Sequence, residues 1–271
     1  MYRHLDITDF FRITSLYTAF RAVYGADYYV SGETHDFWEI VVVTEGEIGV
    51  TAGKEVHHLS KGQAILHEPN EFHNLWSERG REAGILIFSF SAQNLPAPDF
   101  RIFEIQELSE PLSILNELQN TLVFHKHWAE GVKEGQTREA MLAIKHLESF
   151  LLHTVTQNTH QMPHGHLSQS TKHYAEVVRF LEENLHRSLN VQEIARACQI
   201  GDVNLKKIFS RYAGMGVIAY FNHLKIRAAT KMLERGATVR EASEAMGFLN
   251  QNYFCTVFKR VTGKPPKSFK G

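Results

Sequence analysis

Two different hydrophobic periodicities follow one another along the chain. Between residues 28 and 90, apolar runs such as Phe37–Val43 and Gly84–Phe90 are rich in β-branched and aromatic residues, which is typical of strands. Turn-forming residues separate the runs at intervals of about 8–10 residues. Short strands at regular spacing predict a sandwich or barrel. The turn signals are Glu45-Gly46-Glu47, Ala52-Gly53-Lys54, Lys61-Gly62-Gln63 and Pro69-Asn70-Glu71.

The period then becomes helical, with apolar residues every three or four positions. We expect two amphipathic helices that form an antiparallel pair on the barrel. A second possibility is that this pair packs on the same pair of another subunit, which would make the protein a homodimer. The two faces are Leu108, Leu112, Leu115, Leu118 and Leu122, and then Met141, Ile144, Leu147, Leu151 and Val155.

Polar residues without periodicity run from 156 to 170 and predict a linker between two domains. We expect a first domain at residues 1–160, a linker at 161–170 and a second domain at 171–271. Three histidines lie in or beside this linker, at 160, 164 and 166. Without Cys or acidic partners at fixed spacing, they favour a flexible linker over a metal site.

The second of these domains is basic, although the net charge of the whole chain is only -1. Residues 1–170 hold 12 Lys and Arg against 22 Asp and Glu, and residues 171–271 hold 17 against 8, a net of +9. A basic domain joined to an acidic one predicts a polyanionic partner for the basic end. Chance segregation of solvated charges is the alternative.

The bulk composition fits a cytoplasmic protein of two domains. Its 271 residues are too many for one typical domain. Cys198 and Cys255 are too few for a disulfide framework and suit a reducing compartment. No signal peptide is evident at the start, and no run of about 18 apolar residues predicts a membrane span.

The last hundred residues contain an internal duplication. Residues 190–195 align with residues 238–243 at an offset of 48. Each copy begins with a predicted capping box, Asn190 with Glu193 and Thr238 with Glu241. A short helix, a turn and a second amphipathic helix then follow, which is the pattern of a helix-turn-helix. We expect Gly201 and Gly247 to supply the positive φ of the two turns.

The second helix of each copy has an apolar face for the scaffold and a polar face that is free to enter a major groove. Gln and Asn side chains can pair with adenine, and Lys can reach guanine acceptors. Residues near the helix ends suit phosphates. A helical bundle with solvated polar faces is the alternative. The candidate DNA-binding residues are Val203, Lys206, Lys207 and Arg211, and then Gln251, Asn252, Cys255, Thr256, Lys259 and Arg260.

Residues 217–233 predict one continuous helix between the two motifs. A stiff connection of this kind would fix the separation of the two recognition helices. Successive major-groove faces lie about 34 Å apart, so one molecule could reach two adjacent grooves.

This segment resembles the DNA-binding domain of the AraC family. The resemblance covers about residues 172–271 and rests on residues 220–233, residues 246–260 and the closing Gly263-Lys264-Pro265-Pro266. It implies binding to promoter DNA, control of transcription and, for an activator, contact with RNA polymerase. The chain departs from the family pattern at Gly201, Thr256 and Lys270, so we expect fewer guanine and phosphate contacts from the second motif.

The N-terminal half resembles a cupin-type sensor barrel over about residues 20–90. His35-Asp36-Phe37-Trp38-Glu39, Gly46, Gly62 and Pro69-Asn70-Glu71-Phe72-His73 carry this resemblance. In metal-binding cupins three His and one Glu hold an ion, and here Phe37 stands where we place the second His. We therefore expect an organic effector, by resemblance a carbohydrate, and no metal or cofactor. Candidate effector ligands are Arg21, His35, Trp38, Glu39, His73 and Trp76.

The fold class that follows is α+β, with a cupin-like β-barrel and helical pair before an all-α domain with two helix-turn-helix motifs. The function that follows is an effector-controlled, DNA-binding transcription regulator without enzymatic activity. Two alternatives remain open at this point. One is a cupin enzyme with a nucleic-acid-binding appendage, and the other is a DNA-binding protein whose barrel is only a dimerisation scaffold.

Overall fold

The computed structural model describes residues 10–29, 32–97, 101–157 and 168–269. The chain divides into two compact units, one made from most of residues 1–164 and one that contains residues 165–271. The first unit is rich in strands and the second is helical, so the α+β class is confirmed. No helix of the described residues is long and apolar enough to cross a membrane.

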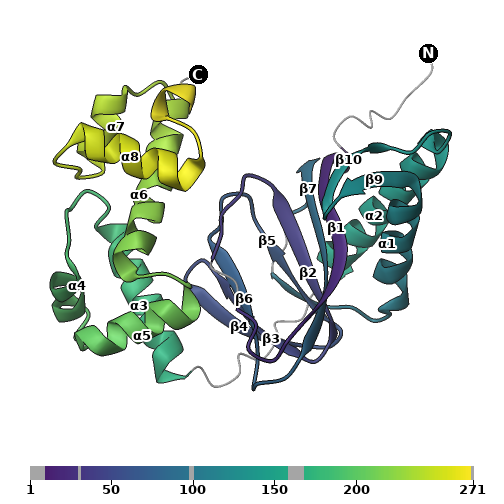
Figure 1. Cartoon of the computed structure of the whole chain (residues 1–271), viewed down its shortest axis with the longest axis horizontal. Helices are drawn as coiled ribbons and strands as arrows, with labels where there is room; N and C mark the ends of the chain where they lie inside the picture. Colours follow the sequence, from purple (N-terminus) through teal and green to yellow (C-terminus); the bar gives the residue numbers. More distant parts are fainter. Residues whose placement is uncertain (1–9, 30–31, 98–100, 158–167, 270–271) are drawn as a thin grey trace, which may run out of the picture. The chain divides into compact units, whose positions relative to one another are not determined.

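The first unit contains two antiparallel sheets (Figure 1). The larger sheet has the strand order β8-β5-β2-β7-β1-β10-β9, and the smaller has the order β4-β3-β6. The strands are β1 (Arg12–Tyr24), β2 (Trp38–Glu45), β3 (Glu47–Ala52), β4 (Glu55–Ser60), β5 (Gln63–His67), β6 (His73–Ser77), β7 (Ala83–Gln93), β8 (Ile102–Glu104), β9 (Leu122–His125) and β10 (Trp128–Val132).

The predicted turns lie between these strands as expected. Gly46, Gly53, Gly62 and Asn70 all have positive φ, which connects each strand sharply to the next. Two features were missed by the sequence analysis. The long strand β1 precedes the predicted strand region, and the β9–β10 hairpin separates the two helices.

Alternation along the strands creates two hydrophobic layers, because successive side chains of a strand point to opposite faces. Val41, Val43, Ile85 and Ile87 face the small sheet and pack on its apolar side chains. Their neighbours in sequence, such as Val42 and Leu86, face the helices. The large sheet is therefore buried on both faces, which explains the continuous apolar runs of β2 and β7.

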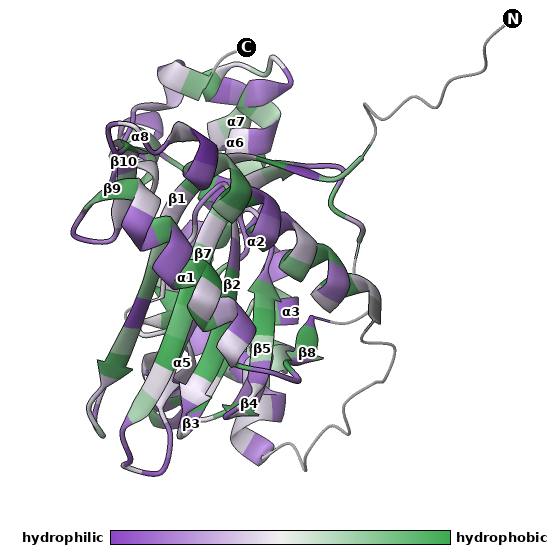
Figure 2. Cartoon of the chain, turned by 90° about the vertical axis from the view of Figure 1, so that its right-hand side faces the viewer, coloured by the Kyte–Doolittle hydropathy of each residue, from purple (hydrophilic) through white to green (hydrophobic). Residues whose placement is uncertain are grey.

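Helices α1 (Ser109–Thr121) and α2 (Thr137–Gln157) cover the outer face of the large sheet, as predicted for the helical pair. In Figure 2, α1 lies in front of strands that carry long apolar stretches. The predicted face of α2 is wrong at Met141, whose side chain is 64% exposed. Ala140 and Ala143 occupy the buried positions instead, because the helix is rotated toward its small residues at this end.

The second unit consists of α3 (Gln169–Glu183), α4 (Val191–Ala197), α5 (Asp202–Tyr212), α6 (Val217–Glu234), α7 (Val239–Ala245), α8 (Gln251–Thr262) and the 3₁₀ turn η1 (Pro266–Phe269). The predicted continuous helix is α6, and it packs against α3 and α5 in one half and against α7 and α8 in the other (Figure 1). Helix α3 starts within the predicted linker at 161–170, capped by Ser168. The three linker-region histidines lie outside the described residues.

Both predicted capping boxes are present. Asn190 accepts from the backbone N–H of Glu193 at 3.0 Å, and Thr238 accepts from that of Glu241 at 3.1 Å, while each Glu side chain accepts from the cap residue's own N–H. Gly247 has φ +64° as expected. The same prediction for Gly201 is wrong, since its φ is -70°.

Gln199 adopts the positive φ of the first turn instead, at +54°. Gly201 is the N-cap of α5 and has no side chain with which to cap it. In the second motif Asn250 takes this position and accepts from the backbone N–H groups of Asn252 and Tyr253. The two motifs therefore differ in how their recognition helices begin.

Candidate nucleic-acid interface and interior polar site

The ten candidate DNA-binding residues lie on two helices, the second helix of each helix-turn-helix. Leu205, Ile208 and Phe209 bury the inner face of α5, and Phe254, Val257 and Phe258 bury that of α8. Nine of the ten candidates are exposed, and Cys255 is half-buried. The exposed candidates are Val203, Lys206, Lys207, Arg211, Gln251, Asn252, Thr256, Lys259 and Arg260.

The chemistry of these two surfaces differs. The outward face of α5 carries Lys206, Lys207 and Arg211, and that of α8 begins with the amides of Gln251 and Asn252. Cationic side chains can bind both phosphates and guanine, whereas amides are suited to adenine. The two faces together can therefore provide positioning contacts and base-specific contacts.

A second polar site lies between the sheets of the first unit. Glu39, at the start of β2, is 8% exposed and pairs in register with His67 of β5 and Ser89 of β7. Its Oε2 accepts from Ser89 Oγ at 2.8 Å, and Ser89 Oγ lies 2.6 Å from Thr18 Oγ1. Strand pairing thus fixes a buried carboxylate in a hydrophobic interior.

Two imidazoles face this carboxylate. His35 Nε2 lies 3.7 Å from Glu39 Oε2, and His73 Nε2 lies 3.6 Å from Glu39 Oε1. His73 comes from the first residue of β6, and His35 precedes β2. His35, Glu39 and His73, three of the six candidate effector ligands, are therefore adjacent, with one potential ligand atom from each lying within 4.8 Å of the others.

A supporting layer surrounds this group. The His67 ring stacks on the His73 ring at 4.3 Å, and its Nδ1 lies 3.2 Å from Glu71 Oε2. Arg101 donates a hydrogen bond to the same carboxylate. Burial would raise the pKa of Glu71, but His67 and Arg101 outweigh it and lower that pKa to about 2.

The titratable groups of the interior share little positive charge. Burial would raise the pKa of Glu39, but the neighbouring imidazoles, His73 foremost, lower it to about 2. Burial and the proximity of His73 lower the pKa of His67 to about 4 and also lower that of His35. The pKa of His73 is raised despite its burial, because Glu39 and Glu33 stabilise its protonated form. The site is thus an ionised carboxylate among imidazoles that compete for a proton.

The other three candidate effector ligands lie elsewhere. Arg21 pairs with Glu45 at 2.5 Å, and its side chain is 40% exposed. Trp38 packs into the layer between the large sheet and the helices. Trp76 lies over Gly49, where any β-carbon would meet its indole ring, and donates to Glu78. None of these three contacts is with the interior polar site.

The sequence analysis missed four residues of the site, namely Glu33, His67, Glu71 and Ser89. A signal for two of them was present, because Glu39 and His67 are odd-numbered positions on strands whose odd-numbered residues face inward. The contact of Glu33 with His73 depends on an isolated bridge between those two residues, which local pattern does not predict.

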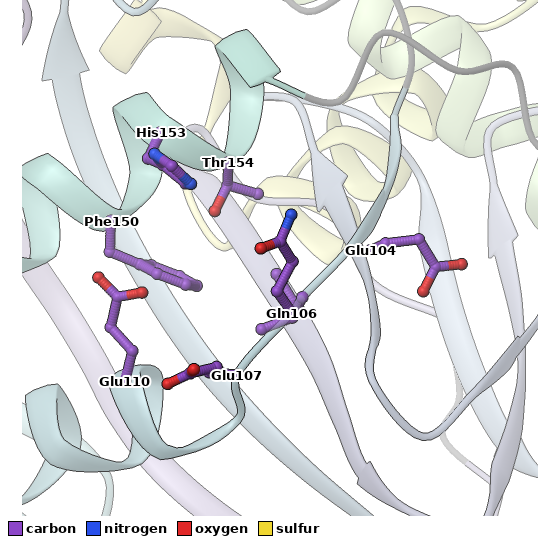
Figure 3. A pocket seen from close by; sticks show the side chains of 8 residues that line it. Glu104, Gln106, Glu107, Glu110, Phe150, His153 and Thr154 are labelled. Atoms are coloured by element: carbon purple, nitrogen blue, oxygen red, sulfur yellow. The ribbon is translucent and has the colours of Figure 1, made fainter.

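A separate pocket of about 220 Å³ lies on the outer side of the large sheet (Figure 3). It is lined by residues 104–107 and by Glu110, Phe150, His153 and Thr154 of α1 and α2. Three carboxylates line this pocket, whereas imidazoles dominate the interior polar site. The two sites are therefore different in chemistry and lie on opposite sides of the sheet.

Comparison with known proteins gives matches in both halves of the chain. A family described as the AraC-like ligand binding domain matches residues 17–97, and one described as a helix-turn-helix domain matches residues 194–271. The uncharacterized HTH-type transcriptional regulator YfiF of Bacillus subtilis is 22% identical over 87% of this chain and 77% of its own length. The HTH-type transcriptional activator RhaS of Pectobacterium carotovorum is 23% identical over 87% and 86%.

Among solved structures, ToxT from Vibrio cholerae with a bound unsaturated fatty acid is 14% identical, covers 95% of this chain and 96% of its own, and has a TM-score of 0.37.

Proposed function

Because the chain belongs to the AraC family of transcription regulators, we propose that it binds promoter DNA through α5 and α8 under the control of a small molecule. The effector would bind in the first unit, and binding would shift the equilibrium between two states of the protein that differ in affinity for DNA. Its role is regulatory rather than enzymatic.

The observation that carries this proposal is the repeated surface of α5 and α8. Each helix buries an apolar face and exposes polar side chains, and α6 packs against both motifs. A helical bundle without a ligand has no need for two such faces on a domain with a net charge of +9. DNA with two adjacent major grooves about 34 Å apart fits this arrangement.

The interior polar site supports an oxygen-rich effector. Carboxylate and imidazole groups inside an apolar layer can fix the hydroxyls of a carbohydrate, which is the effector class that the sequence favours. The proposed domains are residues 1–160 for sensing and dimerisation, 161–170 for the linker and 171–271 for DNA binding. An activating form would also contact RNA polymerase.

Exposed apolar side chains support a homodimer. Met141 and Leu142 of α2 are 64% and 60% exposed, and Trp128 of the adjoining β9–β10 hairpin is 52% exposed. Large apolar side chains at a solvated surface favour protein contacts. A second copy of the chain would bury them and would place two DNA-binding domains on one operator.

The test is selection of binding sites from random DNA, followed by affinity measurements on the selected site. Lys207→Ala and Gln251→Ala should each weaken specific binding by about 1–3 kcal/mol, because each removes one base contact. Lys172→Ala removes the same charge from α3, away from both recognition helices, and should change affinity far less. Wild-type affinity in both recognition-helix variants would contradict the proposed docking.

A further inference from the structure

Two buried imidazole nitrogens point into the interior polar site without a hydrogen-bond partner. They are Nε2 of His35 and Nε2 of His73. In each ring the other nitrogen is occupied, since His35 Nδ1 donates to the carbonyl of Phe37 at 2.9 Å and His73 Nδ1 donates to that of Glu71 at 3.0 Å. A carbonyl oxygen only accepts, so Nδ1 carries the proton and, in the neutral ring, Nε2 presents its lone pair.

This arrangement is the one that metal-binding histidines adopt, with the distal nitrogen fixed by a backbone carbonyl. Between the two lone pairs lies the ionised carboxylate of Glu39. Three electron-pair donors facing one another in a buried space repel unless a cation lies among them.

A proton does not satisfy this group. At 3.6 Å and 3.7 Å, the distances from the two Nε2 atoms to the Glu39 oxygens are too long for hydrogen bonds. Protonating both rings would also place two like charges in the same buried site. A single divalent ion accepts all three donors at once.

The spacing of the donors fits such an ion. Ligands at about 2.1 Å from a tetrahedral metal lie about 3.4 Å from one another. The observed separations of 3.6 Å and 3.7 Å require a shift of only a few tenths of an ångström. Two His and one carboxylate form a donor set that suits zinc, iron and related first-row ions.

Glu33 supplies a fourth donor. Its Oε1 lies 3.8 Å from His73 Nε2, and its backbone exchanges two hydrogen bonds with that of His73, at 2.8 Å and 3.1 Å. Phe37, which the sequence analysis placed at the missing ligand position, instead stacks on the His35 ring at 3.8 Å. The expectation of a metal-free effector site therefore loses its main reason.

We propose that the first unit binds one divalent transition-metal ion through Nε2 of His35, Nε2 of His73 and the carboxylate of Glu39, with Glu33 as the fourth ligand. The role of this ion as part of the effector site rests on the proposed regulatory function. Any coordination position that the protein leaves open would take an oxygen donor of the effector.

The experiment is calorimetric titration of the full-length, chelator-treated chain with Zn²⁺, Mn²⁺, Ni²⁺ and, without oxygen, Fe²⁺. We expect saturable binding of one ion per chain and a higher melting temperature by tryptophan fluorescence. His73→Ala and His35→Ala should each lower affinity by about 100-fold or more, and Glu33→Gln should lower it by about 10-fold.

Two controls separate this site from adventitious histidines. His58→Ala removes an exposed imidazole on β4, and a triple variant with Ala at 160, 164 and 166 removes those of the linker region. Both should bind the ion like the wild type. Circular dichroism of the metal-free variants identifies any that fail to fold, and either His35→Ala or His73→Ala suffices for the comparison.

The proposal is overturned if the wild type binds none of the four ions, or if folded His35→Ala and His73→Ala variants bind as tightly as the wild type. DNA binding by the same preparations keeps the two proposals apart. A chain that binds its selected DNA site but no ion overturns the metal site alone. A chain that binds the ion but no specific DNA overturns the regulatory function alone.

Discussion

Lys225 shows how one residue joins the two halves of the DNA-binding domain. It is 4% exposed, and its Nζ donates to the carbonyls of Arg187 at 2.6 Å and Met246 at 2.7 Å. The ammonium also lies over the rings of Phe221 and Phe248, at 4.5 Å and 5.0 Å. Burial lowers its pKa to about 8. A cation is retained here because it satisfies carbonyls that no backbone N–H reaches.

Replacement of Lys225 by Met should lower the free energy of unfolding of the helical domain by about 1–3 kcal/mol, since two buried carbonyls lose their donor. Lys231→Met on the exposed face of the same helix should change it by less than about 0.5 kcal/mol. Urea unfolding followed by helical circular dichroism measures the difference. Equal stability of the two variants would show that the carbonyls find other partners.

Residue patterns predicted part of the interior site and missed the rest for a physical reason. His35, Glu39 and His73 were predicted because they belong to recognisable motifs. Glu33 and His67 reach the site through pairing between strands that are distant in sequence. Such pairing depends on register, which local periodicity does not determine.

At the scale of elements, the turn of the second helix-turn-helix depends on one glycine. Gly247 has φ +64°, and a β-carbon built on it would lie 2.2 Å from the carbonyl oxygen of His186. Gly236, after α6, has φ +93° but no neighbouring atom within 4 Å of such a carbon. The two positions share the backbone requirement and differ in the close approach.

Gly236→Ala should therefore cost about 1 kcal/mol of stability for its backbone strain, and Gly247→Ala about 2 kcal/mol or more, since a clash is added. Thermal unfolding by circular dichroism ranks the two variants. A smaller loss for Gly247→Ala would mean that α3 moves away from the turn at little cost.

Elements with strong local signals were predicted well. The continuous helix α6 and both capping boxes were confirmed because their signals lie within one or two turns of chain. The β9–β10 hairpin was missed because its residues are mostly exposed, so they show no alternation between core and solvent. The error at Met141 arose because small alanines, not the larger methionine, face the sheet.

At the scale of the whole molecule, the charge is divided so that only the helical half attracts a polyanion. Protein–DNA affinity of this kind falls with salt, because each neutralised phosphate releases counterions. Phosphate contacts contribute to this slope on any sequence, whereas base contacts contribute to discrimination between sequences. The two kinds of contact can therefore be separated on α8.

Lys259→Gln should reduce the slope of log affinity against log salt by about 1 and weaken binding to selected and random DNA equally, because Lys259 lies toward the end of α8 and is assigned to a phosphate. Gln251→Ala should leave the slope unchanged and weaken only the selected site, because an amide carries no charge to release counterions. Fluorescence anisotropy at several salt concentrations measures both quantities. If the two variants exchanged these behaviours, α8 would lie in the groove with its C-terminal end toward the bases, and the order of contacts along the helix would have to be reversed.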